Sequence, residues 1–256
     1  MQVSASIFRE YDIRGVAGTE FTPEAVAEYE LWYGKFPGIT ISLEVAESIG
    51  KAYGTIIRRR GGKKIVVGHE VRPYSEEIKH SFIQGVLSTG CDVTDAGVSL
   101  TPIVYFATAF YGLDGGVNVT GSHNVYFFNG FKTMAKDVYP IYGQELQKMR
   151  QMILTEDYIS GQPGNLTSLN PLADYSSKIV NKFKLSQPLK IVVDCGNGSA
   201  GVFAPQLLRD LGCEVVELYT TPDAKFPNHV PDPEDPHMMR DLSTKVKETG
   251  AALGIG

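Results

Sequence analysis

The segment VTGSHNVYFFNGFK, residues 119–132, brings several chemically capable side chains together. Ser122 lies between Gly121 and His123, and Lys132 follows further along the same segment. A small hydroxyl with cations close by suits an oxygen that carries a phosphoryl group, because the cations hold the transferring oxygens. No GxSxG pattern surrounds Ser122, which disfavours an acyl-transferring serine. The simpler alternatives are a turn-forming serine hydroxyl and a loop histidine bonded to the backbone.

Two charged segments lie nearer the N-terminus. FREYDIRG contains Arg9, Tyr11, Asp12 and Arg14 and shows neither helical nor strand periodicity. Two guanidiniums on a loop suit the recognition of phosphate or carboxylate, and the alternative is a solvated charge run with mutual salt bridges. VGHEVRPYS (67–75) ends a strand in charged residues, and an ion pair that holds a loop is the favoured interpretation there.

A glycine pattern in the second half allows a competing interpretation. IVVDCGNGSAG matches GxGxxG at Gly196, Gly198 and Gly201, after a strand and before a helix, with Glu217 about twenty residues further on. This spacing is typical of an NAD-binding loop. Against that function, Asp194 ends the strand beside the expected pyrophosphate, and the loop would begin only a fragment of a cofactor domain. A tight glycine-rich turn is therefore favoured.

Apolar β-branched runs alternate with helical patterns along the whole chain. The alternation predicts an α/β fold with mixed, mostly parallel sheets covered by helices. Ligands of such sheets bind beyond the carboxyl ends of strands, which is where a loop at 120–132 would follow a strand at 115–119. Capped helix starts are expected at Thr22-Pro23, Ser42 and Thr101-Pro102. The aromatic segment 28–41 is interpreted as a packed surface loop, in preference to a binding lid.

The domain division is expected at a polar segment rich in Gly and Pro, TEDYISGQPGNLTSLNP. It separates a first α/β domain, 1–155, from a second, 170–256, that stops on the strand pattern AALGIG and is expected to be incomplete.

Composition excludes several classes of protein. The net charge of −5 offers no basic field for nucleic acid or an anionic membrane, and no apolar run is long enough to span a bilayer. Three cysteines without CxxC spacing predict neither a disulfide framework nor a zinc site. The expected protein is soluble and cytoplasmic.

FREYDIRG, VGHEVR, the TP helix start and GGVNVTGSHNVYFFNGFK occur in the order and spacing of the α-D-phosphohexomutase family, the phosphomannomutases and phosphoglucomutases. KIVVDCGNGSAG, LGCEVVELY and PDAKFPNHVPDPE similarly resemble the second domain of that family. The resemblance covers nearly the whole chain and favours the tight turn over the NAD loop.

The resemblance implies a phosphoenzyme that interconverts hexose 1-phosphate and 6-phosphate through a bisphosphorylated intermediate. Ser122 would carry the phosphate and hold Mg²⁺ through it. Arg14 and Lys132 would act near the transferring group, with Lys132 a candidate general acid or base. His123 would belong to the catalytic set, and Tyr11 and Asn124 would help to bind substrate. Hexose 1,6-bisphosphate would be the activator and intermediate.

The chain departs from the family pattern at Val125, Phe128 and Glu70, where Pro, Tyr and Asp are usual, and in the segment 28–41. It also ends at Gly256, before the aspartate-rich metal loop that the family carries. We therefore expect impaired mutase activity in this chain alone and self-association through an exposed strand edge. The alternatives are a non-catalytic sugar-phosphate binding or interaction module and an NAD-binding protein. Which hexose is used is not encoded in these residues.

Overall fold

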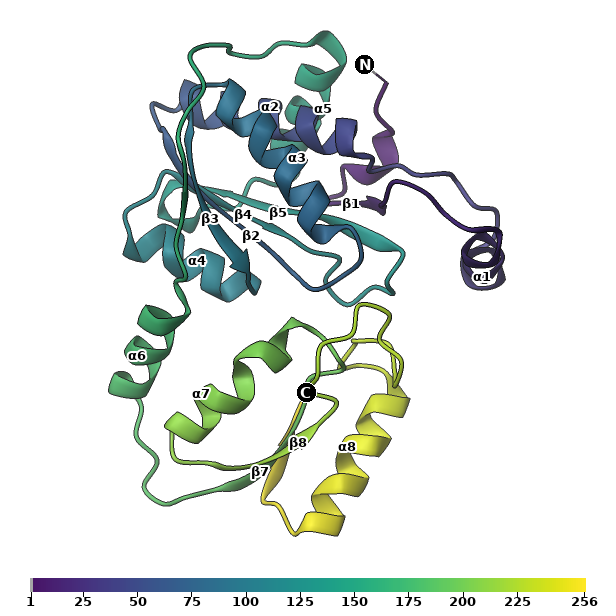
Figure 1. Ribbon diagram of the computed structural model, residues 1–256, viewed down its shortest axis with the longest axis vertical. Coiled ribbons are helices and arrows are strands. Elements are labelled where there is room, and N and C mark those ends of the chain that lie inside the picture. Colours follow the sequence, from purple (N-terminus) through teal and green to yellow (C-terminus); the bar gives the residue numbers. More distant parts are fainter. Residues whose placement is uncertain (1) are drawn as a thin grey trace. The chain divides into compact units, whose positions relative to one another are not determined.

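A computed structural model describes residues 2–256 (Figure 1). The chain divides into two compact units. The first runs to Gly121 and resumes with Phe127–Leu169, and the second comprises Ser122–Tyr126 and Asn170–Gly256. Both units are α/β, which confirms the predicted fold class. The predicted domain limits, 1–155 and 170–256, stay a prediction.

The first unit contains a six-stranded mixed sheet in the order β1-β5-β4-β2-β3-β6. Strands β2, β3, β4 and β6 are parallel, whereas β5 runs antiparallel to both β4 and β1. The loop that carries Ser122 therefore joins two adjacent antiparallel strands at the carboxyl end of β4. The strands are β1 (Ile13–Val16), β2 (Lys64–His69), β3 (Asp92–Val98), β4 (Gly115–Val119), β5 (Phe128–Ala135) and β6 (Leu166–Ser168).

Helices cover both faces of this sheet (Figure 1). The main core lies where α2, α3 and α5 pack on one face, and α4 packs against Val66 and Met134 on the other. Burial of these apolar side chains is the main stabilising contribution to the unit. The helices are α1 (Pro23–Tyr33), α2 (Leu43–Arg59), α3 (Ser75–Ser88), α4 (Thr101–Phe110) and α5 (Gln144–Thr155), with short 3-10 turns η1 (Ala5–Ile7) and η2 (Lys136–Val138).

Two of the three predicted helix caps are confirmed. The hydroxyls of Thr22 and Ser42 accept hydrogen bonds from the N–H groups of Ala25 and Val45. The third prediction is wrong, because Thr101 is already the first residue of α4 and caps nothing. Its hydroxyl is instead bonded to an amide on the neighbouring strand.

Four segments of the first unit differ from their predicted structure. The polar segment predicted as the linker contains β6, which pairs with β3. The FREYDIRG segment is not all loop, since β1 begins at Ile13. The exposed loop predicted at 120–132 ends at Phe127, because β5 supplies the antiparallel partner of β4. The segment 28–41 is partly helical, since α1 extends to Tyr33, where the prediction was a surface loop.

The second unit has a three-stranded parallel sheet in the order β8-β7-β9. The helix predicted after the glycine pattern is split into a 3-10 turn and a separate helix that begins at Ala204. The elements of the second unit are α6 (Leu172–Lys182), β7 (Lys190–Asp194), η3 (Ser199–Val202), α7 (Ala204–Asp210), β8 (Glu214–Leu218), α8 (Pro236–Thr249) and β9 (Leu253–Ile255).

Candidate active site

Ser122 lies in the turn that follows β4. Its φ of 57° is in the left-handed region, which is uncommon for a residue with a side chain. The preceding residue, Gly121, is buried, whereas Ser122 is half-buried and His123 is exposed. The chain therefore leaves a packed strand end and turns sharply at the serine.

Arg14 and Lys132 lie on the same face of the first sheet. Arg14 pairs with Gly130 across β1 and β5, and Lys132 pairs with Asn118 across β5 and β4. Paired residues, and residues two apart on a strand, share one face. This is the face that α4 covers, because Asn118 Nδ2 donates to Thr101 Oγ1 at the start of α4 over 3.1 Å. Strand register thus brings two cations that are far apart in sequence to one side of the sheet.

Arg14 is buried, with only 3% of its surface exposed, which was not expected of a loop arginine. Its guanidinium donates to the carbonyl of Gly121 and to the carboxylate of Asp12. Burial lowers the pKa of Arg14, and the nearby Asp12 partly offsets that effect. The arginine predicted for phosphate recognition is therefore fixed directly beside the residue that precedes Ser122.

The ion pair predicted in VGHEVRPYS is confirmed. Arg72 Nε donates to Glu70 Oε1 over 2.9 Å, and both residues are buried. The same carboxylate oxygen accepts a hydrogen bond from the N–H of Gly121. Sequence reasoning identified the pair but missed this contact with the serine turn, because no local pattern links a strand end to a turn some fifty residues later.

The other predicted site residues differ in exposure. Tyr11 is 77% exposed and stacks against Tyr142, with 6.5 Å between ring centroids. His123 is exposed, and its Nδ1 lies 3.7 Å from Asp232 Oδ1 within the second unit. Asn124 is half-buried. The side chains of Tyr11 and His123 are therefore accessible to a ligand.

The segment 28–41 packs against the far end of the serine loop. Tyr29 contacts Phe127 and Phe128, with ring centroids 5.6 and 6.0 Å apart, and Tyr33 also contacts Phe128. Trp32, by contrast, is 72% exposed. The predicted packing is thus present at Tyr29 and Tyr33, on a helix rather than on a loop.

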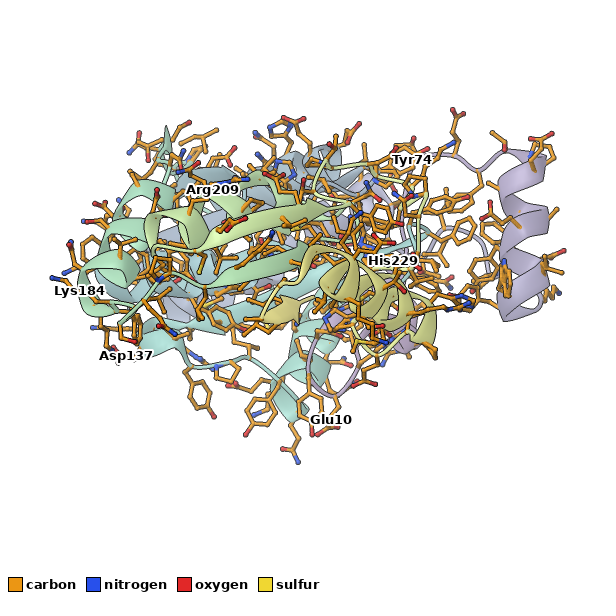
Figure 2. All side chains as sticks on the ribbon, turned by 90° about the horizontal axis from the view of Figure 1, so that it is seen from below. Glu10, Tyr74, Asp137, Lys184, Arg209 and His229 are labelled. Atoms are coloured by element: carbon orange, nitrogen blue, oxygen red, sulfur yellow. The ribbon has the colours of Figure 1, made fainter. Side chains whose placement is uncertain are left out.

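The glycine pattern of the second unit forms a closed polar turn. Asp194 Oδ1 accepts from the N–H of Gly196 over 2.8 Å, and His229 Nε2 lies 3.2 Å from both carboxylate oxygens. His229 is labelled in Figure 2. Glu217, the residue expected to bind a ribose, is paired with Arg209. A buried carboxylate occupies the position beside which a pyrophosphate would bind, so NAD binding is not favoured.

No group of three or more His, Cys, Asp or Glu side chains among the described residues could hold a metal ion. Hard cations such as Mg²⁺ require several oxygen ligands. The donors present in residues 2–256 therefore do not by themselves fit a Mg²⁺ site. No helix in the same part of the chain is long and apolar enough to cross a membrane.

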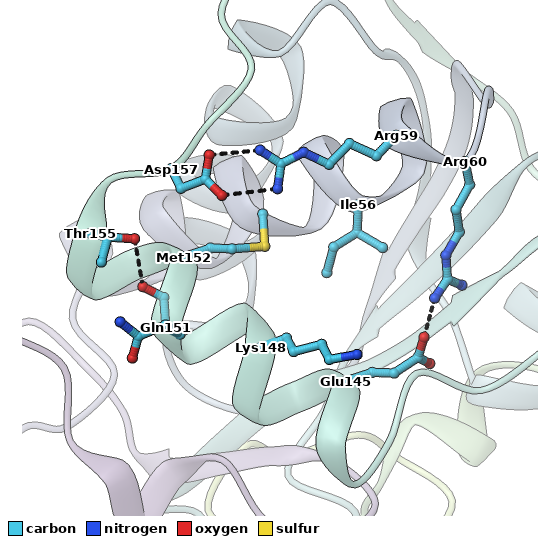
Figure 3. A pocket seen from close by; sticks show the side chains of 9 residues that line it. All are labelled: Ile56, Arg59, Arg60, Glu145, Lys148, Gln151, Met152, Thr155 and Asp157. Carbon is cyan, nitrogen blue, oxygen red and sulfur yellow. Dashed lines mark hydrogen bonds and ion pairs between the residues drawn. The ribbon is translucent and has the colours of Figure 1, made fainter.

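A separate cavity of about 470 Å³ lies between α2 and α5 (Figure 3). Its two arginines are already neutralised: Arg59 forms two hydrogen bonds with Asp157, and Arg60 pairs with Glu145. An anion would have to displace these carboxylates to reach the arginines, and Lys148 is the remaining cation of the lining. The cavity is therefore a weaker candidate for a phosphate site than the serine turn.

Comparison with known proteins identifies the two halves of the chain. Residues 32–160 match the family model "Phosphoglucomutase/phosphomannomutase, alpha/beta/alpha domain I", and residues 173–256 match domain II of the same family. A phosphomannomutase/phosphoglucomutase of Pseudomonas aeruginosa is 39% identical over 98% of this chain and 50% of its own length. A phosphoglucomutase of Neisseria meningitidis is 32% identical over 99% of this chain and 51% of its own.

A solved structure agrees. The crystal structure of a phosphoglucomutase/phosphomannomutase family protein from Burkholderia thailandensis has a TM-score of 0.87 and 38% identity, over 99% of this chain and 52% of that chain. The chain thus spans about half the length of the relatives that it matches. With two consecutive family domains and a matching structure, the chain belongs to the phosphoglucomutase/phosphomannomutase family.

Proposed function

We propose that this chain is the serine-bearing part of a mutase that interconverts hexose 1-phosphate and hexose 6-phosphate through a phosphoserine. The observation that carries the proposal is the serine turn. In a member of this family, Ser122 takes a left-handed conformation directly after Gly121, whose carbonyl is bonded to a buried arginine and whose N–H is bonded to a buried carboxylate. Such a turn presents a hydroxyl from a rigid support.

The phosphoryl transfer is proposed to run in two balanced steps. The P–O bond to Ser122 breaks as a P–O bond to a sugar hydroxyl forms, and the hydroxyl loses its proton. That proton ends on the Ser122 oxygen. In the second step the Ser122 hydroxyl attacks the other phosphoryl group of the resulting hexose 1,6-bisphosphate, the P–O bond to the sugar breaks, and the Ser122 proton passes to the released sugar oxygen. Phosphoryl transfer needs in-line placement and charge neutralisation more than a strong nucleophile, which is why a serine near cations suffices.

Each predicted residue receives a role in this proposal. Lys132 is assigned as the general acid or base, and Arg14 holds the transferring oxygens. His123 belongs to the catalytic set. Tyr11 and Asn124 contact the sugar phosphate. The location of Arg14 and Lys132 on one sheet face supports a shared role for these two cations.

Mg²⁺ is proposed as the metal of the intact protein, where it would neutralise charge on the transferring phosphate. In residues 2–256 the only ligand assigned to it is the phosphate on Ser122, since no cluster of potential metal ligands is present there. No step above depends on a metal geometry. The hexose 1,6-bisphosphate activator belongs to the same proposal.

The natural full-length protein should be assayed with glucose 1-phosphate and mannose 1-phosphate, catalytic hexose 1,6-bisphosphate and Mg²⁺. Formation of the 6-phosphate, lost in the Ser122→Ala variant, is the expected result. Binding of hexose phosphate without turnover would contradict the proposal and favour a non-catalytic binding module. Thermal stabilisation by NAD alone would contradict both the mutase and the sugar-phosphate binding module.

A further inference from the structure

Glu70 joins the ends of two neighbouring strands. Its backbone N–H donates to the carbonyl of Val119 over 3.0 Å, at the last residue of β4. Its side chain then accepts from Gly121, two residues further along that chain. Glu70 is 8% exposed, so water does not compete for these bonds. The residue therefore holds the path of the chain from the strand end to the serine turn.

The residue before Ser122 is held from two sides. Its N–H donates to Glu70, and its carbonyl, which belongs to the peptide bond that leads into Ser122, accepts from Arg14. A left-handed φ at Ser122 costs free energy that the surroundings must supply. These two charge-assisted hydrogen bonds fix the peptide groups on which that conformation depends.

The turn also has no room for a side chain at Gly121. A Cβ atom on Gly121 would overlap the Nε of Arg72 and the carbonyl oxygen of Phe128. Only glycine allows the turn to approach the Glu70–Arg72 pair this closely. The Glu70–Arg72 pair and Gly121 therefore pack tightly against one another.

Glu70 also offsets the burial of the Arg72 guanidinium, which lies near a second buried arginine, Arg14. Arg14 and Arg72 are each 3% exposed and repel one another. Burial lowers the pKa of Arg72, with Glu70 opposing that effect. Removal of one partner from a buried ionic group is strongly destabilising because an uncompensated charge remains.

We infer that Glu70 is a positioning residue of the phosphoserine loop, which sets the direction of Ser122 through the Gly121 N–H while neutralising Arg72. The inference rests on the proposed function of Ser122. Glu70 need not touch the substrate. Its effect should be on the rate of phosphoryl transfer, because a displacement of about 1 Å can cost on the order of 10²-fold in rate.

A matched control exists in the same sheet. Asp95 is also a carboxylate that accepts from a cation and a glycine N–H: Lys79 Nζ lies 2.7 Å from its Oδ2, and the Gly97 N–H donates to its Oδ1 over 2.8 Å. Its two partners lie on α3 and β3 and not in the serine turn. Asp95→Ala therefore has a similar electrostatic cost without the proposed effect on Ser122.

The test compares Glu70→Ala, Glu70→Gln and Asp95→Ala in the natural full-length protein, at a temperature where thermal unfolding shows each to be folded. We expect kcat to fall about 10²-fold in Glu70→Ala and about 10-fold in Glu70→Gln, which keeps an acceptor oxygen, with KM within about twofold. Asp95→Ala should keep kcat. An equal fall in kcat for Glu70→Ala and Asp95→Ala, or a change confined to KM, would overturn the inference.

A structural readout separates this inference from the proposed function. The backbone amide resonances of Gly121 and Ser122 should move in Glu70→Gln and stay in place in Asp95→Ala, whether or not the protein turns over. If the unsubstituted protein has no mutase activity but the resonances still move in Glu70→Gln, the proposed function is refuted and the positioning role is kept. Unmoved resonances in Glu70→Gln would refute the positioning role itself.

Discussion

Two turns each have a buried carboxylate that accepts the N–H of a glycine, and in each the residue after that glycine has a left-handed backbone. In the first turn, which follows β4, the carboxylate is Glu70, and Gly121 is followed by Ser122 with φ 57°. In the second it is Asp194, and Gly196 is followed by Asn197 with φ 56°.

The two turns differ in the chemistry and the burial of that left-handed residue. Asn197 is 6% exposed; its amide donates to the carbonyl of Thr221 over 2.8 Å and accepts from Asn228 over 2.7 Å. Ser122 is half-buried and follows a glycine that is held by charged groups. The same backbone conformation therefore belongs to a buried, internally bonded asparagine in the second turn and to a half-buried serine in the first.

The largest effect is expected from removal of that hydroxyl. Ser122→Ala should lower mutase turnover on the order of 10³-fold or more, because it removes the proposed carrier of the phosphate, and should leave thermal stability nearly unchanged. Steady-state kinetics of the natural full-length protein measures it. Ser199→Ala, which removes the buried serine of the second turn, is the matched control and should retain turnover. Equal losses in the two variants would erase the distinction between the turns.

Substitutions in the second turn should instead change the stability of the second unit. His229→Leu leaves Asp194 buried without its partner and should destabilise the second unit by about 3 kcal/mol. Urea unfolding of the variant gives the value. His237→Leu, at an exposed histidine on α8, should change stability by less than about 0.5 kcal/mol. An unchanged free energy of unfolding in His229→Leu would show that the His229–Asp194 pair does not stabilise the turn.

Alanine substitutions at two tightly packed glycines, one in each turn, sharpen the same contrast. A Cβ at Gly201 would overlap the Thr220 carbonyl, and one at Gly121 would overlap the Phe128 carbonyl. Each change should cost about 1–3 kcal/mol, and only Gly121→Ala should also reduce turnover. Gly161 has open space around it, so Gly161→Ala should be nearly neutral. Turnover loss in Gly201→Ala as well would indicate that both turns serve catalysis.

The smallest expected effect is a pH dependence of the first unit. Burial, followed by the charge of Lys79, lowers the pKa of His69, whose Nδ1 lies 2.9 Å from the Glu70 carbonyl. The unfolded chain then binds more protons than the folded one below the ordinary histidine pKa of about 6.5, so stability falls as pH falls through it. The slope for one proton is at most about 1.4 kcal/mol per pH unit. Chemical denaturation at several pH values should show a flatter profile in His69→Gln; an unchanged slope would contradict this assignment.

Much of the fold could be predicted because hydrophobic periodicity is local. The strands at 64–69 and 190–194 and the caps at Thr22 and Ser42 follow from neighbouring residues alone. Strand β5 was missed because Asn129 and Gly130 resemble loop residues, although pairing with β1 and β4 makes them strand.

Candidate site residues could be proposed from the sequence, whereas the contacts that support them could not. Ser122 could be chosen from its neighbours, whereas its left-handed backbone depends on contacts from Arg14 and Glu70 that are distant in sequence. The position of Arg14 depends likewise on the pairing of β1 with β5. Long-range contacts of this kind are not encoded in any local pattern.

The most direct test of the central claim is the location of covalent phosphate. The protein isolated from its natural source, or incubated with hexose 1,6-bisphosphate, should be digested and its phosphopeptides sequenced by mass spectrometry before and after phosphatase treatment. We predict one phosphatase-sensitive phosphate, on Ser122. Phosphate on another residue, or none under both conditions, would contradict the account of the serine turn.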